Sequence, residues 1–272
     1  MAHLMYDSEK DIKVEREYLA NLQTPPPMGS RHAPYPFYDF VLDTVNAVEN
    51  AGFTIREEEY AIQKDEQRLF GLLHVSKPRA RVPYATQAIV PSLRTQTDPT
   101  AWNLLVALRG AHDQSISRGL AIGSQVMVCS NLCFHGDLGN WKSKQTTNIA
   151  GRIPDMVNDA VSGLDNALNR LTVDFDAFNA HKIEREAGEN ILVDIYRSGG
   201  FSSSQLGRAL DDWDECSVEE HTANGRNLWW LFNSATHALK PTGANNNHAD
   251  LQHRSTLVFS HLSRRARPMI AA

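Results

Sequence analysis

The pattern of apolar residues changes near Gly139, and this change limits the folds that the chain can adopt. Before it, β-branched or alternating apolar residues occupy short segments separated by turn-forming residues, at 53–62, 68–76, 87–94 and 103–112. After it, apolar residues recur at steps of three and four, as in amphipathic helices. The order predicts the α+β class, with an antiparallel β-meander packed with helices in the first half and a largely helical second half.

The prolines and glycines suggest where the domain begins. Residues 1–35 are expected to form a loosely structured N-terminal arm, because Pro25–Pro27 and Gly29 cannot continue a helix or join a central strand. The remaining residues, 36–272, are expected to be a single α+β domain. We expect it to be rich in sheet over 36–140 and helical over 150–272.

Helix boundaries are predicted from spacing and capping residues. The spacing predicts helices over 37–50, ending before Gly52, and over 155–183. A break at Gly188 or at Gly199–Gly200 precedes helices capped by Ser202 and Asn224, and a last helix is expected over 249–266. Within the first half, 117–123 is predicted as a short helix and 125–134 as a strand.

The 272 residues are enough to bury a core, and their net charge of −5 excludes a uniformly basic coat. The charges are nevertheless sorted along the chain. Residues 75–152 carry 9 basic and 3 acidic residues, whereas residues 153–220 carry 5 basic and 15 acidic ones. The acidic segment could neutralise the basic one internally, or it could meet the basic segment of a second copy in head-to-tail self-association.

Three features bear on where the protein works. The N-terminal residues alternate charges and lack the apolar stretch of a signal peptide, and no apolar run approaches the roughly 20 residues of a membrane span. Three cysteines fit a reducing compartment better than a disulfide framework. We therefore expect a cytoplasmic protein with no membrane partner.

Three short motifs occur in a fixed order. They are the turn at Arg109–Ser115 with His112, Asp113 and Ser115, the strand end with Cys129 and Asn131, and the tryptophan-led segment Asn227–Thr236. In this order the chain resembles the phage/plasmid-like domain-of-unknown-function 932 family over roughly residues 85–240. Leu132 and Cys133 depart from the family pattern. The resemblance implies an origin on a mobile genetic element and no established reaction.

Nucleic-acid binding by an oligomer is the leading functional hypothesis, and single strands, as in strand-annealing proteins, are one candidate ligand. Basic residues of the second segment can contact phosphates, and interleaved aromatic residues can stack on bases. The predicted contact residues are Arg94, Arg109, Arg118, Trp141, Lys142, Lys144 and Arg152. Aromatic residues among strands are more often part of the core.

Two alternatives remain open. A metal-dependent phosphodiesterase or nuclease would use His112, Asp113, His135 and Asp137, whose side chains suit Mn, Fe or Zn. However, Asp113 before Gln114–Ser115 is equally typical of a tight turn, and Cys129 and Cys133 are better explained as buried thiols than as zinc ligands. The second alternative is a counter-defence protein that binds a host protein.

No phosphate-binding loop, dinucleotide fingerprint or nucleophile elbow occurs in the sequence, so we predict no cofactor and no catalytic residue. In the segment 229–232, Trp229, Trp230 and Phe232 cannot all face one way on a helix. At least one of them is therefore expected at an interface.

Overall fold

The computed structural model describes residues 11–63, 65–77, 102–126, 132–134, 139–216, 218, 222, 224–240 and 248–270. In this part of the chain the first half forms one antiparallel sheet and most of the second half is helical, so the predicted α+β class is confirmed. Within the same residues, no helix combines the length and the apolar composition that crossing a bilayer requires.

The sheet runs in the order β1-β2-β3-β4-β5-β6, and β7 pairs with β5 on the same side as β6. All pairings among the described strands are antiparallel, as a meander requires. The strands are β1 (Asp11–Val14), β2 (Thr54–Gln63), β3 (Arg68–Ser76), β4 (Trp102–Ala111), β5 (Arg118–Val126), β6 (Leu132–Phe134) and β7 (Asn140–Ser143).

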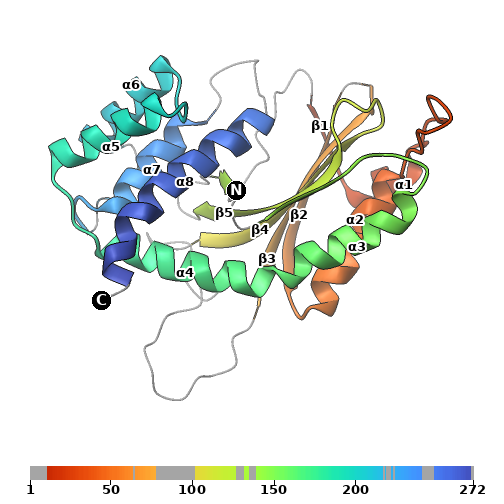
Figure 1. Ribbon diagram of the computed structural model, residues 1–272, viewed down its shortest axis with the longest axis horizontal. Coiled ribbons are helices and arrows are strands. Elements are labelled where there is room, and N and C mark those ends of the chain that lie inside the picture. Colours follow the sequence, from red (N-terminus) through yellow and green to blue (C-terminus); the bar gives the residue numbers. More distant parts are fainter. Residues whose placement is uncertain are drawn as a thin grey trace.

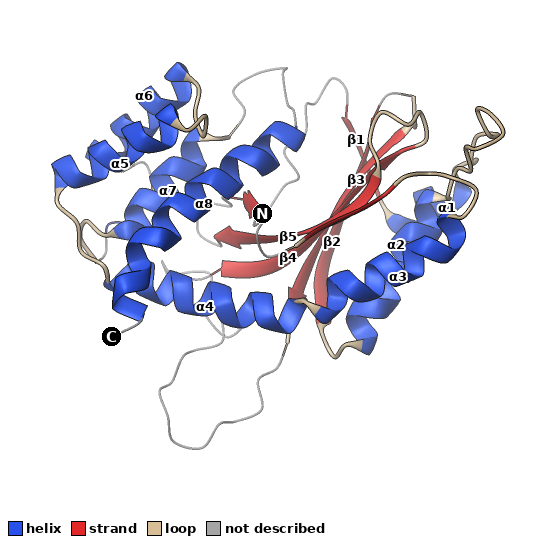
Figure 2. Cartoon of the chain, viewed as in Figure 1, coloured by secondary structure: helices blue, strands red, loops and turns tan. Residues whose placement is uncertain are grey.

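The described helices are α1 (Arg16–Asn21), α2 (Phe37–Asn50), α3 (Ile149–Ser162), α4 (Leu164–Ala180), α5 (Arg185–Arg197), α6 (Ser203–Asp214), α7 (Leu228–Ala238) and α8 (His248–Ile270). Helices α2 and α3 lie beside the sheet, and α5–α8 gather at its other end (Figure 1). Helices α3 and α4 follow one another along the molecule and connect the two groups, as Figure 2 also shows.

Several boundaries follow from local chemistry. Ser202 caps α6 as predicted: its hydroxyl accepts the backbone N–H of Gln205, whose side chain accepts the N–H of Ser202. The cap predicted at Asn224 is wrong by three residues, because Asn227 accepts the N–H of Trp230 and begins α7.

The short helix predicted over 117–123 is wrong, since these residues begin β5. Leu120 and Ile122 are both buried at a spacing of two, which is the period of a strand. The strand predicted over 125–134 is described only as the end of β5 and as β6. The strand predicted over 87–94 lies outside the described residues.

The helix predicted over 155–183 is two helices, α3 and α4, that meet at Gly163. The expected break is at Gly199, which adopts a φ of +84° that favours glycine. Gly188 instead lies inside α5, where a Cβ atom would overlap the indole ring of Trp213. This glycine therefore allows α5 to approach Trp213 closely and does not end a helix.

The segment predicted as an N-terminal arm contains β1 and α1. Strand β1 pairs with β2 over Asp11–Val14, and Val14 and Leu19 are buried in the core. Residues 11–21 are therefore part of the sheet and its packing.

Both faces of the sheet are buried. The large core lies between one face and the helices, and a smaller cluster of Ala61, Phe70, Leu72 and Leu105 lies on the opposite face. At least one of Trp229, Trp230 and Phe232 was expected at an interface with another molecule. This prediction is wrong, because all three side chains are buried inside the chain. Helix α7 is apolar on nearly every side and packs against α4, α6 and α8.

Candidate nucleic-acid interface

Four of the seven predicted nucleic-acid contacts line one pocket between β7 and the first turns of α3. The pocket has a volume of about 490 Å³. We call it the β7–α3 groove, and its side chains that matter here are Trp141, Lys142, Lys144, Arg152, Asp155 and Asp159. The structure thus brings together four predicted contacts that are up to eleven positions apart in the sequence.

Pairing between β5 and β7 positions the first of these residues. Trp141 lies opposite Leu120 and Lys142 opposite Gly119. Because alternate residues of a strand face opposite sides, Trp141 turns toward the main core and α3, where its ring approaches Gly163. Trp141 is half-buried, whereas Lys142, Lys144 and Arg152 are exposed. The groove therefore combines one partly covered aromatic ring with three solvated cations.

These cations have no side-chain partner in the part of the chain that the structure describes. Among the residues described, Lys142, Lys144 and Arg152 form no ion pair and no hydrogen bond through their side chains. Other surface cations are paired, such as Lys77 with Asp165 at 2.6 Å and Arg185 with Asp214 at 2.7 Å. The pair of Lys77 and Asp165 joins the basic segment to the acidic one, but this neutralisation does not extend to the groove cations.

A second pocket, of about 640 Å³, adjoins the groove because Lys144 and Thr146 line both. We call it the His32 pocket. It is enclosed by residues 28–32, 114–117 and 144–146, and all its lining residues lie in the described part of the chain. They include Arg31, His32 and several hydroxyl and amide side chains, but no carboxylate.

Backbone contacts hold the wall of the His32 pocket in place. His32 forms an antiparallel bridge with Thr146, and Ala33 donates its N–H to the carbonyl of Gln145 at 3.3 Å. The side chain of Gln145 in turn donates to the carbonyl of Ala111 and accepts the N–H of Tyr35. Residues far apart in the sequence therefore form one ordered wall.

Arg118 does not reach the surface where a phosphate could contact it. Its side chain is 0% exposed, packs over the ring of Phe37 at 4.2 Å, and donates Nη2 to the carbonyl of Tyr35. Burial lowers the pKa of Arg118 to about 9. The predicted phosphate contact at Arg118 is therefore replaced by a structural role in the core.

Arg109 lies on the opposite face of the sheet from Arg118. Its partner on β5 is Gly119, and the residues of that face alternate with those facing the main core. Arg109 is half-buried, and burial lowers the pKa of its guanidinium. The side chain of Lys142 shares this face, because Lys142 also opposes Gly119. Trp141 opposes Leu120 and faces the main core, so Arg109 and Trp141 lie on opposite faces of the sheet.

The side chains of the turn motif, His112, Asp113 and Ser115, make packing and turn contacts. The ring of His112 lies 4.1 Å from that of Phe37, and its Nδ1 is 3.4 Å from Nη2 of Arg118. Burial and then the charge of Arg118 lower the pKa of His112 to about 4. Asp113 accepts the N–H of Ser115 at 3.0 Å, which confirms the turn interpretation of Asp113.

The remaining predicted residues cannot be placed: Arg94, Cys129, Asn131, His135 and Asp137 lie outside the described residues. Within the described ones, no group of three His, Cys, Asp or Glu side chains could hold a metal ion. Cys133 is buried, and its thiol contacts the carbonyl of Ser255 at 3.5 Å.

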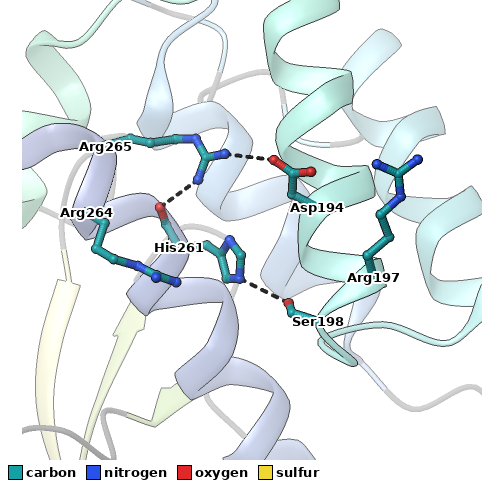
Figure 3. Close-up of a pocket in the computed structure, with 6 residues that line it drawn as sticks. All are labelled: Asp194, Arg197, Ser198, His261, Arg264 and Arg265. Atoms are coloured by element: carbon teal, nitrogen blue, oxygen red, sulfur yellow. Dashed lines mark hydrogen bonds and ion pairs between the residues drawn. The ribbon is translucent and has the colours of Figure 1, made fainter.

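A third pocket, of about 530 Å³, lies between α5 and α8 (Figure 3). His261 Nε2 is 3.0 Å from the hydroxyl oxygen of Ser198. The same hydroxyl donates its proton to the carbonyl of Ile195 at 2.8 Å. Because the hydroxyl proton goes to Ile195, the imidazole supplies the proton between His261 and Ser198. This arrangement is the reverse of an activated serine nucleophile.

The comparisons with known proteins add no identity. No protein-family model matches the chain, and neither the curated proteins nor the solved structures contain a match. The resemblance to the domain-of-unknown-function 932 family therefore stays a prediction.

Proposed function

We propose that this protein binds nucleic acid without catalysing a reaction, and that it does so as an oligomer. The β7–α3 groove contacts the strand: Lys142, Lys144 and Arg152 bind phosphates and Trp141 stacks on a base. The observation that carries the proposal is that these three cations line one pocket with a half-buried tryptophan and form no ion pair among the described residues.

Elementary electrostatics supports this assignment. A solvated cation that is already paired gains little from a phosphate, whereas an unpaired one releases counterions from the nucleic acid when it binds. Three such cations within one groove give a measurable dependence of the binding constant on salt. Asp155 and Asp159 also line the groove and oppose binding, which limits the affinity for non-specific anions.

Trp141 favours a single strand. A base that is already stacked within a duplex does not offer its face to a side chain, whereas an unpaired base can stack on an aromatic ring. Because Trp141 is partly covered by α3 and the adjoining turn, a flexible strand reaches it more easily than a rigid duplex does.

The test is a fluorescence-anisotropy titration with labelled single-stranded and double-stranded oligonucleotides at two salt concentrations, after light scattering has fixed the oligomeric state. We expect tighter binding to the single strand and weaker binding at higher salt. A triple variant with Gln at Lys142, Lys144 and Arg152 should bind with a weaker dependence of its binding constant on salt. The slope should fall by the contribution of about three phosphate contacts. Lys13→Gln, at an exposed cation of β1, is the matched control.

A second variant tests whether removing negative charge from the groove strengthens binding. Asp155→Asn with Asp159→Asn removes the carboxylates from the groove and should strengthen binding several-fold at low salt, because like charge no longer faces the phosphates. Absence of binding at low salt would contradict the proposal. Metal analysis and capture of host proteins would then test the metal-dependent phosphodiesterase and the counter-defence alternatives.

A further inference from the structure

The His32 pocket offers hydrogen-bond donors in excess. Its wall carries the guanidinium of Arg31, the ammonium of Lys144 and the hydroxyls of Ser30, Ser117 and Thr146, and no lining residue is acidic. Among the described residues, Arg31 and Lys144 form no ion pair. The composition of the pocket therefore favours an anion with several acceptor oxygens.

His32 adds an independent observation. It is 7% exposed, and its Nδ1 accepts the backbone N–H of Met28 at 2.9 Å, so the neutral ring carries its proton on Nε2. Nε2 is buried and forms no hydrogen bond with any of the residues that the structure describes. A buried donor without an acceptor is unfavourable, and such groups in native proteins usually meet a ligand or an ordered water.

We propose that the His32 pocket binds a phosphomonoester, with Arg31, Lys144 and the Nε2–H of His32 as its main donors. A terminal phosphate carries three unshared oxygens and close to two negative charges, whereas a phosphodiester within a strand has two free oxygens and one charge. The number of hydrogen-bond donors in the pocket therefore matches a terminal phosphate better than a phosphodiester.

The adjoining groove indicates that this phosphate belongs to the end of a bound strand. Lys144 and Thr146 are shared by both pockets, so a strand that lies along the β7–α3 groove reaches the His32 pocket with one end. This form of the inference, recognition of a phosphorylated strand end, rests on the proposed function. A free mononucleotide has the same phosphomonoester, and its binding does not depend on the groove.

The experiment compares one oligonucleotide sequence in three forms: with a 5′-phosphate, with a 3′-phosphate, and with neither. We expect one phosphorylated form to bind on the order of tenfold more tightly, the effect of one charge-assisted contact. Arg31→Gln should abolish this preference and leave the affinity for the unphosphorylated strand within about twofold. Lys13→Gln should leave both unchanged.

A pair of substitutions distinguishes the loss of the hydrogen-bond donor from a loss of folding. Asn places its amide near the Nδ1 position and Gln near the Nε2 position, so His32→Asn removes the proposed donor and His32→Gln keeps one. The preference for the phosphorylated strand should fall in His32→Asn and be retained in His32→Gln. A loss in both variants, with thermal unfolding unchanged, would overturn the role of Nε2.

Calorimetric titration with adenosine monophosphate and with inorganic phosphate completes the test. Equal binding of all three oligonucleotides, with no heat from adenosine monophosphate, would overturn the inference and leave the proposed function intact. Failure of every oligonucleotide to bind, together with Arg31-dependent binding of adenosine monophosphate, would reject the proposed function and support a mononucleotide as the ligand of the pocket.

Discussion

A Cβ atom on Gly110 would stand 2.5 Å from Nη1 of Arg118, so the buried guanidinium fills the space that a side chain at position 110 would need. The close approach occurs between the end of β4, where Gly110 is the last residue but one, and the start of β5 at Arg118. The two residues therefore constrain one another, and their substitution energies are coupled.

Gly110→Ala should destabilise the protein by about 1–3 kcal/mol, the usual cost of forcing extra volume into a packed core. Arg118→Met removes the guanidinium that causes the clash, so Gly110→Ala should cost clearly less in that background. Urea unfolding of the four proteins of a double-mutant cycle measures the difference. Equal costs in both backgrounds would show that the clash is not with Arg118.

His112 makes the folded state sensitive to acid. Its pKa is about 4 in the folded protein against 6.5 for a free histidine, so the unfolded chain takes up the proton first as the pH falls. The stability linked to His112 is complete above pH 6.5 and is lost between pH 6.5 and pH 4, by about 3 kcal/mol in total.

Unfolding free energies at several pH values between 7 and 4, for the wild type and for His112→Gln, test this expectation. The difference between the two proteins should shrink as the pH falls, because only the wild type loses the contribution of His112. A constant difference across that range would contradict a lowered pKa.

Trp141 provides an optical signal for the groove. All five tryptophans lie in the described part of the chain, and Trp102, Trp213, Trp229 and Trp230 are buried, whereas Trp141 is half-buried. A single-stranded oligonucleotide that stacks on Trp141 should quench part of the intrinsic fluorescence. The quenching should disappear in Trp141→Leu, which should also weaken binding by about 1–3 kcal/mol.

The emission wavelength provides the control. Loss of a half-exposed tryptophan should shift the emission of the free protein slightly toward the blue, while the four buried rings still report a folded core. Quenching by oligonucleotide that persists at full strength in Trp141→Leu would place the bound strand elsewhere.

Two helical glycines should respond in opposite directions to alanine. Gly188→Ala in α5 should destabilise by about 1–3 kcal/mol, because the new methyl group meets the ring of Trp213. Gly207 in α6 is exposed and has open space around it, so Gly207→Ala should stabilise by about 0.5–1 kcal/mol through helix propensity. Thermal unfolding of the two variants measures both effects, and a shift in the same direction would contradict this account.

The sequence predicts those parts of the fold in which local pattern and tertiary packing agree. Alternation and turn residues predict β2, β3 and β4, and Ser202 as an N-cap predicts the start of α6. Strand β5 was missed because its glycines, Gly119 and Gly123, weaken the alternating pattern. Helix α5 was obscured by Gly188, whose role depends on a distant tryptophan.

The site was predictable only in part. Lys142, Lys144 and Arg152 are close in sequence to Trp141, so local charge indicates the groove. Arg31 and His32 were missed because a bridge to Thr146 brings them there, and no pattern within residues 1–35 indicates it. Burial of Arg118 was not expected either, since a charged side chain is usually exposed and only the packing of Phe37 and Gly110 reveals the space for it.

The far edge of the sheet is divided between two short strands. Residues Arg118–Ala121 of β5 pair with β7, and Gly123–Gln125 pair with β6. An incoming strand would find only three or four consecutive residues with which to pair on β6 or β7. At the opposite edge, β1 pairs with Tyr60–Gln63 of β2 alone. Short edge strands discourage strand addition between molecules. Copies of this protein that associate should therefore not extend the sheet from one molecule into the next across the edge formed by β6 and β7.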